Sequence, residues 1–145
     1  MQPGLWPELA PKKVEYLKYL RDGDRPVRTG EISARFGVDP STVTKAMNEL
    51  ASAGLVSHVP YHGVRLTAEG IALAGFLTRR HRILGLVLTH YGLDPEEACE
   101  AASRFESYVP KEVVDTICRS MGHPTTGVCG MIARDEDCCR LEGSA

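Results

Sequence analysis

The stretch Glu31–Leu55 places two short amphipathic segments on either side of a tight turn. Apolar residues at Ile32 and Phe36 predict a first helix. Gly37 ends that helix, because glycine tolerates the positive φ that helix C-termini often adopt. Asp39-Pro40 then suits the N-cap and the first position of a second helix. The spacing predicts a helix-turn-helix, and this unit constrains the rest of the fold.

The second of these helices has two unlike sides. Val43, Met47 and Leu50 recur at helical spacing and predict a buried face. The opposite side carries short hydrogen-bonding groups and one cation, which suit the base edges of a DNA major groove. These candidates for DNA binding are Ser41, Thr42, Thr44, Lys45 and Asn48. The alternative is a plain helical hairpin with a polar, solvent-facing side.

Directly after this unit the sequence changes from helical spacing to alternation. Leu55–Val59 and Val64–Thr67 are typical of two short strands, and Gly63 supplies a turn between them. A helix-turn-helix followed by a hairpin predicts a winged helix. Arg28, before the first helix, and Arg65, on the second strand, are the candidates for phosphate contact. A winged helix that binds protein instead of DNA is the competing interpretation.

Charge and apolar patterning narrow the function classes. Residues 1–80 carry eleven Lys and Arg against eight Asp and Glu, whereas residues 81–145 carry six against eleven. A basic half suits a polyanionic partner. No apolar run reaches the roughly 18 residues that a membrane span needs, and the N-terminus lacks a signal-peptide pattern. We therefore expect a cytoplasmic protein without a membrane partner. The sequence has no recognisable nucleophile–base pair or phosphate loop, and we expect no enzyme.

The predicted fold is mainly α-helical, a winged helix-turn-helix followed by a helical dimerisation domain. The expected parts are an N-terminal arm at 1–11 that contains Trp6, a DNA-binding domain at 12–70, a helical dimerisation and sensing domain at 71–125, and an irregular cysteine-containing tail at 126–145. A long helix from about Thr67 to Tyr91 is apolar on several sides, so one side is free for a second copy of the chain. Arg79 and Arg80 within it are expected to form a solvated turn.

Five cysteines are an odd number for a cytoplasmic chain, and this favours metal binding or free thiols over a disulfide framework. Thiolates prefer zinc, ferrous iron or an iron–sulfur cluster to manganese. The candidate thiol ligands are Cys99, Cys129, Cys138 and Cys139, although adjacent cysteines are strained as ligands of one ion. Cys118, on the apolar side of a helix, is expected to belong to the core, and His123 to be structural. A thiol–disulfide switch and inert thiols are the alternatives.

Several motifs together resemble one family. The segments VDPSTVTKAMNEL, YHGVRLTAEG, RRHRILG and MGHPTT, in this order and spacing, are similar to the iron- and manganese-dependent repressors related to the diphtheria toxin repressor and the manganese transport regulator. The resemblance covers about residues 12–126. It implies a homodimeric, metal-activated transcriptional repressor that binds a palindromic operator in double-stranded DNA. Iron is the favoured metal, with manganese, zinc or an iron–sulfur cluster as alternatives.

The resemblance also implies metal ligands. Glu15 matches a first-helix ligand, His81 the long-helix histidine, and Glu106 the glutamate of the acidic helix. Helical spacing places Cys99 and Glu106 on one face of that acidic helix, and Cys129 falls where relatives often have a histidine.

Three ligand positions of the family are altered here, to Gly85, Ser103 and Ser107. Cysteines are therefore expected to complete the site. The alternative functions are a thiol redox-responsive regulator without metal and a winged-helix protein-interaction module.

Overall fold

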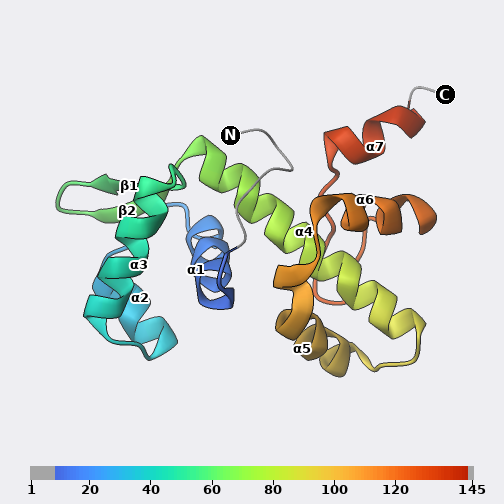
Figure 1. Ribbon diagram of the computed structural model, residues 1–145, viewed down its shortest axis with the longest axis horizontal. Coiled ribbons are helices and arrows are strands. Elements are labelled where there is room, and N and C mark those ends of the chain that lie inside the picture. Colours follow the sequence, from blue (N-terminus) through green and yellow to red (C-terminus); the bar gives the residue numbers. More distant parts are fainter. Residues whose placement is uncertain (1–8, 144–145) are drawn as a thin grey trace. The chain divides into compact units, whose positions relative to one another are not determined.

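The computed structural model in Figure 1 describes residues 9–143, so Trp6 lies outside the described residues. The described chain divides into two compact units, Ala10–Ala74 and the residues from Gly75 onward. The first unit holds α1 (Pro11–Asp22), α2 (Thr29–Phe36), α3 (Pro40–Ser52), β1 (Val56–Val59), β2 (Gly63–Leu66) and the start of α4 (Ala68–His90). The second holds the rest of α4, α5 (Pro95–Phe105), the 3-10 turn η1 (Glu106–Tyr108), α6 (Lys111–Ser120) and α7 (Glu136–Gly143).

The helix-turn-helix is confirmed, and its apolar positions are those that the spacing predicts. Val43, Met47 and Leu50 of α3 are fully buried. Helix α2 ends at Gly37, which has a φ of 64°. Asp39 does occupy the N-cap of α3, but its side chain makes no cap hydrogen bond. Its carboxylate accepts a hydrogen bond from the Ser41 hydroxyl at 3.2 Å instead.

The predicted hairpin is a wing with one extra backbone partner. Strands β1 and β2 pair antiparallel, with Val56 opposite Leu66. Val27, just before α2, exchanges two hydrogen bonds of 2.8 Å with Val64 and so adds an isolated bridge to β2. Gly63 begins β2 with a φ of 111°. A Cβ at this position would lie 2.2 Å from the Val27 carbonyl oxygen, so the pairing requires a glycine.

Replacing Gly63 by alanine is expected to lower the free energy of unfolding by about 1–3 kcal/mol, the usual cost of one strained backbone position. The added methyl group must also push the Val27 backbone away from β2. The measurement is urea unfolding followed by circular dichroism. Gly30→Ala in α2 is the matched control, because a Cβ there meets no atom within 4 Å and alanine favours a helix. Equal stability of the two variants would contradict the prediction.

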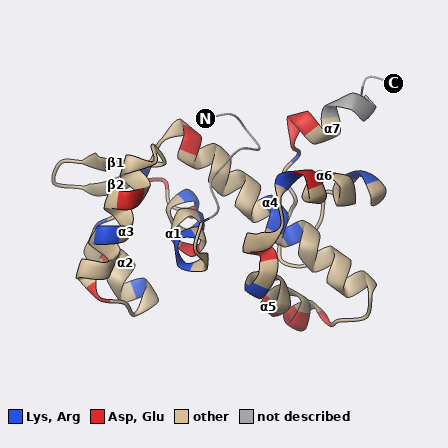
Figure 2. Ribbon diagram, viewed as in Figure 1, with Lys and Arg blue, Asp and Glu red and all other residues tan. Residues whose placement is uncertain are grey.

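Helices α4 and α5 each begin with a side-chain cap. The Thr67 hydroxyl accepts from the Gly70 N–H at 3.1 Å at the start of α4. The Asp94 carboxylate accepts from the N–H groups of Glu96 and Glu97 at 2.9 and 3.1 Å at the start of α5. Acidic residues in the first turn favour a helix N-terminus, and Figure 2 shows them there on α5. None of the helices in the described chain is long and apolar enough to cross a membrane.

Two expectations about this unit are wrong. Arg79 and Arg80 are not a solvated turn, because they are only 3% and 6% exposed. Arg79 forms an ion pair of 2.7 Å with Asp115 of α6. The Arg80 guanidinium lies 5.3 Å from the centre of the Phe76 ring, in a cation–π contact. The tail is also not irregular throughout, because Glu136–Gly143 forms helix α7.

Candidate metal centre and nucleic-acid interface

The polar side of α3 is a continuous exposed surface. All five predicted DNA-binding residues of this helix, Ser41, Thr42, Thr44, Lys45 and Asn48, are exposed, while the opposite side is buried. Thr44 donates a hydrogen bond to the Pro40 carbonyl at 3.0 Å. A helix that presents hydroxyl, amide and ammonium groups outward can offer both donors and acceptors to base edges.

The wing and α2 present the two predicted phosphate contacts. Arg28 and Arg65 are both exposed. The Arg28 guanidinium donates a hydrogen bond of 3.3 Å to the carbonyl of Tyr61, at the tip of the wing. Tyr61 has a φ of 67° and is almost fully exposed. Arg28 therefore ties the start of α2 to the wing, and its charge lies beside the wing tip.

In the second unit an imidazole and two thiols converge, and a carboxylate contacts the imidazole. His81 Nδ1 lies 2.6 Å from Glu106 Oε2. One ring nitrogen of His81 and the sulfurs of Cys99 and Cys129 all lie within 4.8 Å of one another. Helix α4 supplies His81, α5 supplies Cys99, and the loop after α6 supplies Cys129. The Glu106 carboxylate contacts the imidazole and is not itself within that group. One nitrogen and two sulfurs fit a borderline or soft divalent ion better than a hard one.

The altered residue Gly85 has a packing reason. A Cβ at Gly85 would lie 3.0 Å from a methyl group of Val128, a tight contact that glycine avoids next to the loop that carries Cys129. Arg82 also holds this loop, because its guanidinium donates to the Met131 carbonyl. The loop closes on itself through a hydrogen bond of 2.8 Å from the Gly127 N–H to the Gly130 carbonyl. These contacts hold the loop that carries Cys129 beside α4.

The thiol of Cys99 is held in its neutral form. Burial raises the pKa of Cys99, and the neighbouring Cys129 thiol and Glu106 carboxylate raise it further. A bound cation would favour the deprotonated form of Cys99, because a metal ion binds the thiolate and its binding releases the proton.

Glu106 follows directly after the end of α5 at Phe105 and begins the 3-10 turn η1. It keeps helical backbone angles, with φ −56° and ψ −31°, and its N–H donates to the Ala102 carbonyl. The turn directs its buried carboxylate to His81. Ser103, at a ligand position of the family, is exposed and donates to the Cys99 carbonyl of its own helix at 3.0 Å.

Glu15 belongs to the first unit. Its carboxylate is about half exposed and pairs with Lys12 at 3.3 Å.

The remaining two candidate cysteines lie in a second cluster. Ligand atoms of Cys118, His123, Cys138 and Cys139 all lie within 4.8 Å of one another. Burial, followed by the Cys118 thiol and the Asp115 carboxylate, raises the pKa of Cys138 to about 12. The four thiols considered as one possible centre are therefore divided between two groups in the described chain. Sequence reasoning missed Cys118 and His123 as possible ligands. The only available signal was that they lie five residues apart, and that two adjacent cysteines follow them in the chain.

Comparison with known proteins agrees with this architecture. Residues 8–64 match the family described as iron dependent repressor, N-terminal DNA binding domain, and residues 67–131 match its metal binding and dimerisation domain. The transcriptional regulator MntR of Escherichia coli is 38% identical over 104 residues, which cover 70% of this chain and 67% of that protein.

Solved structures show the same fold. A hypothetical protein from Sulfolobus solfataricus superposes with a TM-score of 0.74 at 25% identity, over 86% of this chain and 96% of that one. ScaR with bound Zn²⁺ superposes with a TM-score of 0.70 at 27% identity, over 83% of this chain and 62% of that one. The matched families are transcriptional regulators and not enzymes. The chain therefore belongs to the family of metal-dependent transcriptional repressors that includes the iron-dependent repressors and MntR.

Proposed function

We propose that the protein is a cytoplasmic, homodimeric repressor whose binding to a palindromic operator is controlled by a divalent transition metal at His81, Cys99, Glu106 and Cys129. The observation that carries this proposal is the group of one imidazole and two thiols whose donor atoms lie within 4.8 Å of one another, with the Glu106 carboxylate in contact with that imidazole. The bound ion would supply a cross-link between α4, the α5–η1 segment and the loop after α6. The family's metal dependence is thereby assigned to residues of this chain.

Ferrous iron is the favoured ion, and manganese is disfavoured. Two thiolate ligands discriminate against Mn²⁺, which prefers oxygen donors, and Fe²⁺ and Zn²⁺ both accept mixed nitrogen, oxygen and sulfur ligands. A single ion is favoured over an iron–sulfur cluster, because such a cluster usually takes four cysteines and the thiols here lie in two groups.

The test uses protein purified and assayed without air. DNA affinity is measured by fluorescence anisotropy while Fe²⁺, Zn²⁺ or Mn²⁺ is added, alongside elemental and sulfide analysis. We expect Fe²⁺ or Zn²⁺ to raise DNA affinity at a free concentration at least about tenfold below that of Mn²⁺. Activation by Mn²⁺ alone, or stoichiometric acid-labile sulfide, would overturn the choice of ion. Full DNA affinity in the metal-free protein, lost on oxidation of the thiols, would favour the redox alternative.

The exposed side of α3 is proposed to enter the major groove, with Arg28 and Arg65 on phosphates. Asn48→Ala is expected to weaken specific binding by about 1–3 kcal/mol and to relax selectivity at one base pair. Lys45→Ala is expected to weaken binding to all sequences and to reduce the dependence of affinity on salt by about one ion. Both effects are read from affinities for specific and random duplexes at several salt concentrations. Absence of DNA binding in both the wild type and Lys45→Glu would favour the protein-interaction module. Unchanged DNA binding in Lys45→Glu and Asn48→Ala would show that another surface contacts DNA.

Dimerisation is proposed through the second unit. An open groove there is lined mainly by α4 and α6, with Val87, Tyr91, Ile117 and Met121 as its apolar members. Tyr91 is 79% exposed, which is unusual for a large apolar side chain beside other apolar groups. A two-fold dimer would match a palindromic site.

Ile117→Glu is expected to convert the dimer to a monomer in light scattering coupled to gel filtration, because it buries a charge in the interface. Arg119→Glu adds the same residue to the exposed side of α6 and is expected to leave the dimer intact. A wild-type monomer at micromolar concentration would contradict the proposal.

Glu15 of α1 is proposed as a metal ligand, as the family resemblance implies. Its exposed carboxylate pairs with Lys12 among the described residues, and a surface pair of this kind contributes little energy. Comparison of Glu15→Gln with Lys12→Gln, in the metal titration described above, separates a ligand from a surface charge.

A further inference from the structure

The second cluster lies at the junction of α6, the turn that follows it and α7. Cys118 is in the last turn of α6, His123 is in the turn, and Cys138 and Cys139 are in the first turn of α7. The three thiols are 2%, 4% and 4% exposed, so all of them face the interior. None of them is in a disulfide. The α7 cysteines lie beyond residue 131, where the match to the family's metal-binding domain ends.

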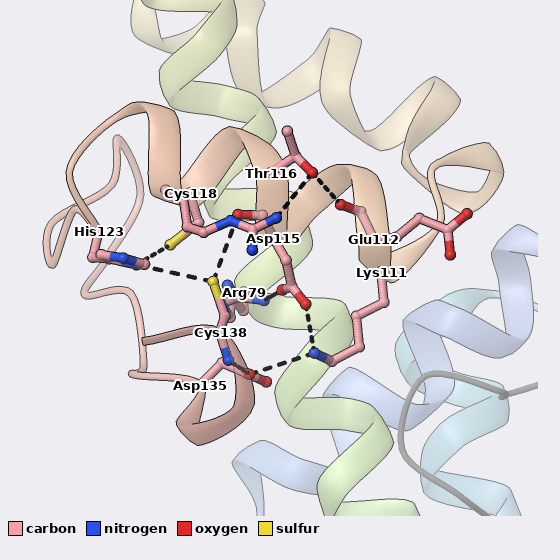
Figure 3. Close-up of polar contacts among 10 residues, drawn as sticks. Arg79, Lys111, Glu112, Asp115, Thr116, Cys118, His123, Asp135 and Cys138 are labelled. Atoms are coloured by element: carbon pink, nitrogen blue, oxygen red, sulfur yellow. Dashed lines mark hydrogen bonds and ion pairs between the residues drawn. The ribbon is translucent and has the colours of Figure 1, made fainter. Parts of the chain in front are cut away.

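The distances between donor atoms are those of a tetrahedral site. His123 Nδ1 lies 3.3 Å from the sulfur of Cys118 and 3.9 Å from that of Cys138 (Figure 3). Zinc–sulfur and zinc–nitrogen bonds of about 2.3 and 2.0 Å give a tetrahedral sulfur–nitrogen edge of roughly 3.5 Å. The two observed edges lie on either side of this value. Small shifts of these side chains are therefore enough for one ion to lie at bonding distance from His123, Cys118 and Cys138.

The backbone around the cluster is held in place on each side. His123 has a φ of 54°, a conformation that costs free energy in a non-glycine residue, and its N–H donates to the Cys118 carbonyl at 2.8 Å. This turn brings the imidazole back to α6. The Cys138 N–H donates to the Asp135 carboxylate at 2.8 Å. Lys111 Nζ lies 3.4 Å from the same carboxylate and so connects the start of α7 to α6.

We propose that Cys118, His123, Cys138 and Cys139 form a structural zinc site that fastens α7 to α6. Three thiolates and one imidazole complete a tetrahedral shell, and closed shells of this kind are structural and not catalytic. The site is distinct from the cluster at His81, shares no residue with it, and does not depend on the function proposed for that cluster. Zinc is assigned because it accepts this donor set without a geometric preference of its own.

The site explains two features of the cluster. Four potential ligands on three short segments are buried together, although each thiol alone would pack equally well as a small apolar side chain. The adjacent Cys138 and Cys139 also both point inward, and consecutive positions on a helix differ by about 100° in direction. One ion beside the first turn of α7 gives both sulfurs a common partner.

The test uses two single cysteine substitutions and one double cysteine variant of the chain. Cys138→Ser and Cys139→Ser remove ligands of the proposed zinc site, and the double variant Cys99→Ser/Cys129→Ser removes the thiols of the other cluster. Each protein is purified under reducing conditions without chelator, loaded with zinc, and passed through a desalting column before elemental analysis. We expect one tightly held zinc per chain in the double variant, and a second in the wild type, whose His81 cluster also accepts zinc. Adding Cys138→Ser or Cys139→Ser to the double variant is expected to weaken binding of the remaining zinc at least about 100-fold, measured against a chromophoric chelator.

Two further measurements keep the result interpretable if a variant folds poorly. Cobalt loaded into the double variant is expected to show thiolate charge-transfer bands and the intense visible bands of a tetrahedral ion. Removal of zinc from the double variant is expected to expose α7 to limited proteolysis near Arg134, with α6 unaffected. Failure of the reduced double variant to bind zinc or cobalt would overturn the proposal. So would iron with sulfide at this site, a Cys118–Cys138 disulfide in freshly isolated protein, or unchanged zinc affinity when Cys138→Ser or Cys139→Ser is added to the double variant.

Discussion

Replacing His81 by alanine is expected to remove the metal response of DNA binding, so that affinity with saturating metal equals affinity without it. His81 supplies the nitrogen donor of the cluster, and its Nδ1 lies 2.6 Å from the Glu106 carboxylate. Loss of a group that only supports a ligand typically costs 10–100-fold in metal affinity, so loss of the ligand itself is expected to cost about 100-fold or more. An effector commonly changes the affinity for a second ligand by about 5–150-fold. We therefore expect the variant to lose an increase of this size in DNA affinity on addition of metal.

Ser103→Ala is the matched control for this experiment. Ser103 occupies a ligand position of the family, but its hydroxyl bonds to the Cys99 carbonyl of its own helix. It is therefore expected to keep the metal response of the wild type. Cys99→Ser provides a second test that leaves the contact of His81 with Glu106 intact. A full metal response in both His81→Ala and Cys99→Ser would show that the ion binds elsewhere.

Replacing Asp115 by asparagine is expected to lower the free energy of unfolding by about 3 kcal/mol, near the lower end of the cost of breaking a buried ion pair. The Arg79 guanidinium is 3% exposed, and Asp115 is 17% exposed and keeps some contact with water. Arg79 keeps its charge in the variant, since its pKa lies far above neutrality. Burial lowers that pKa, but the hydrogen bond from Arg79 to Asp115 and the surrounding charges raise it by more.

A double variant without either charge separates the loss of the ion pair from the cost of leaving Arg79 unpaired. Arg79→Leu/Asp115→Leu is expected to be more stable than Asp115→Asn, because it leaves no buried charge unpaired. Asp137→Asn, on the exposed first turn of α7, is the control and is expected to change stability by less than about 0.5 kcal/mol. Urea unfolding measures all four proteins. Equal stability of Asp115→Asn and Asp137→Asn would contradict the importance of the pair.

The same pair predicts a dependence on pH. Burial raises the pKa of Asp115, but hydrogen bonds from Lys111 and Arg79 lower it by more, so the net pKa is below its ordinary value of 3.8. A lowered pKa in the folded state stabilises the fold fully above the ordinary value, and this contribution is lost as the pH falls through the lowered value. The stability difference between wild type and Asp115→Asn is therefore expected to be constant near neutrality and to shrink below about pH 4. A difference that grows on acidification would contradict this assignment.

Local sequence patterns determined the DNA-binding unit almost completely. The apolar spacing of α3, the end of α2 at Gly37 and the alternation of the wing each depend on neighbouring residues, so the sequence alone sufficed to place them. Only the tertiary structure revealed the additional role of Gly63, because its contact is with the backbone of Val27, far away in the sequence.

In the second unit, local sequence patterns did not suffice to place the candidate site. The sequence named His81, Cys99, Glu106 and Cys129 as candidates, but it grouped Cys99 and Cys129 with the cysteines of α7. The division into two clusters depends on how α4, α6 and the loop between α6 and α7 pack, and no local pattern reports such packing. The buried state of Arg79 likewise depends on Asp115, 36 residues away. Residue types thus determined the chemistry that this chain offers to a metal, and long-range packing alone decided which of its donors meet.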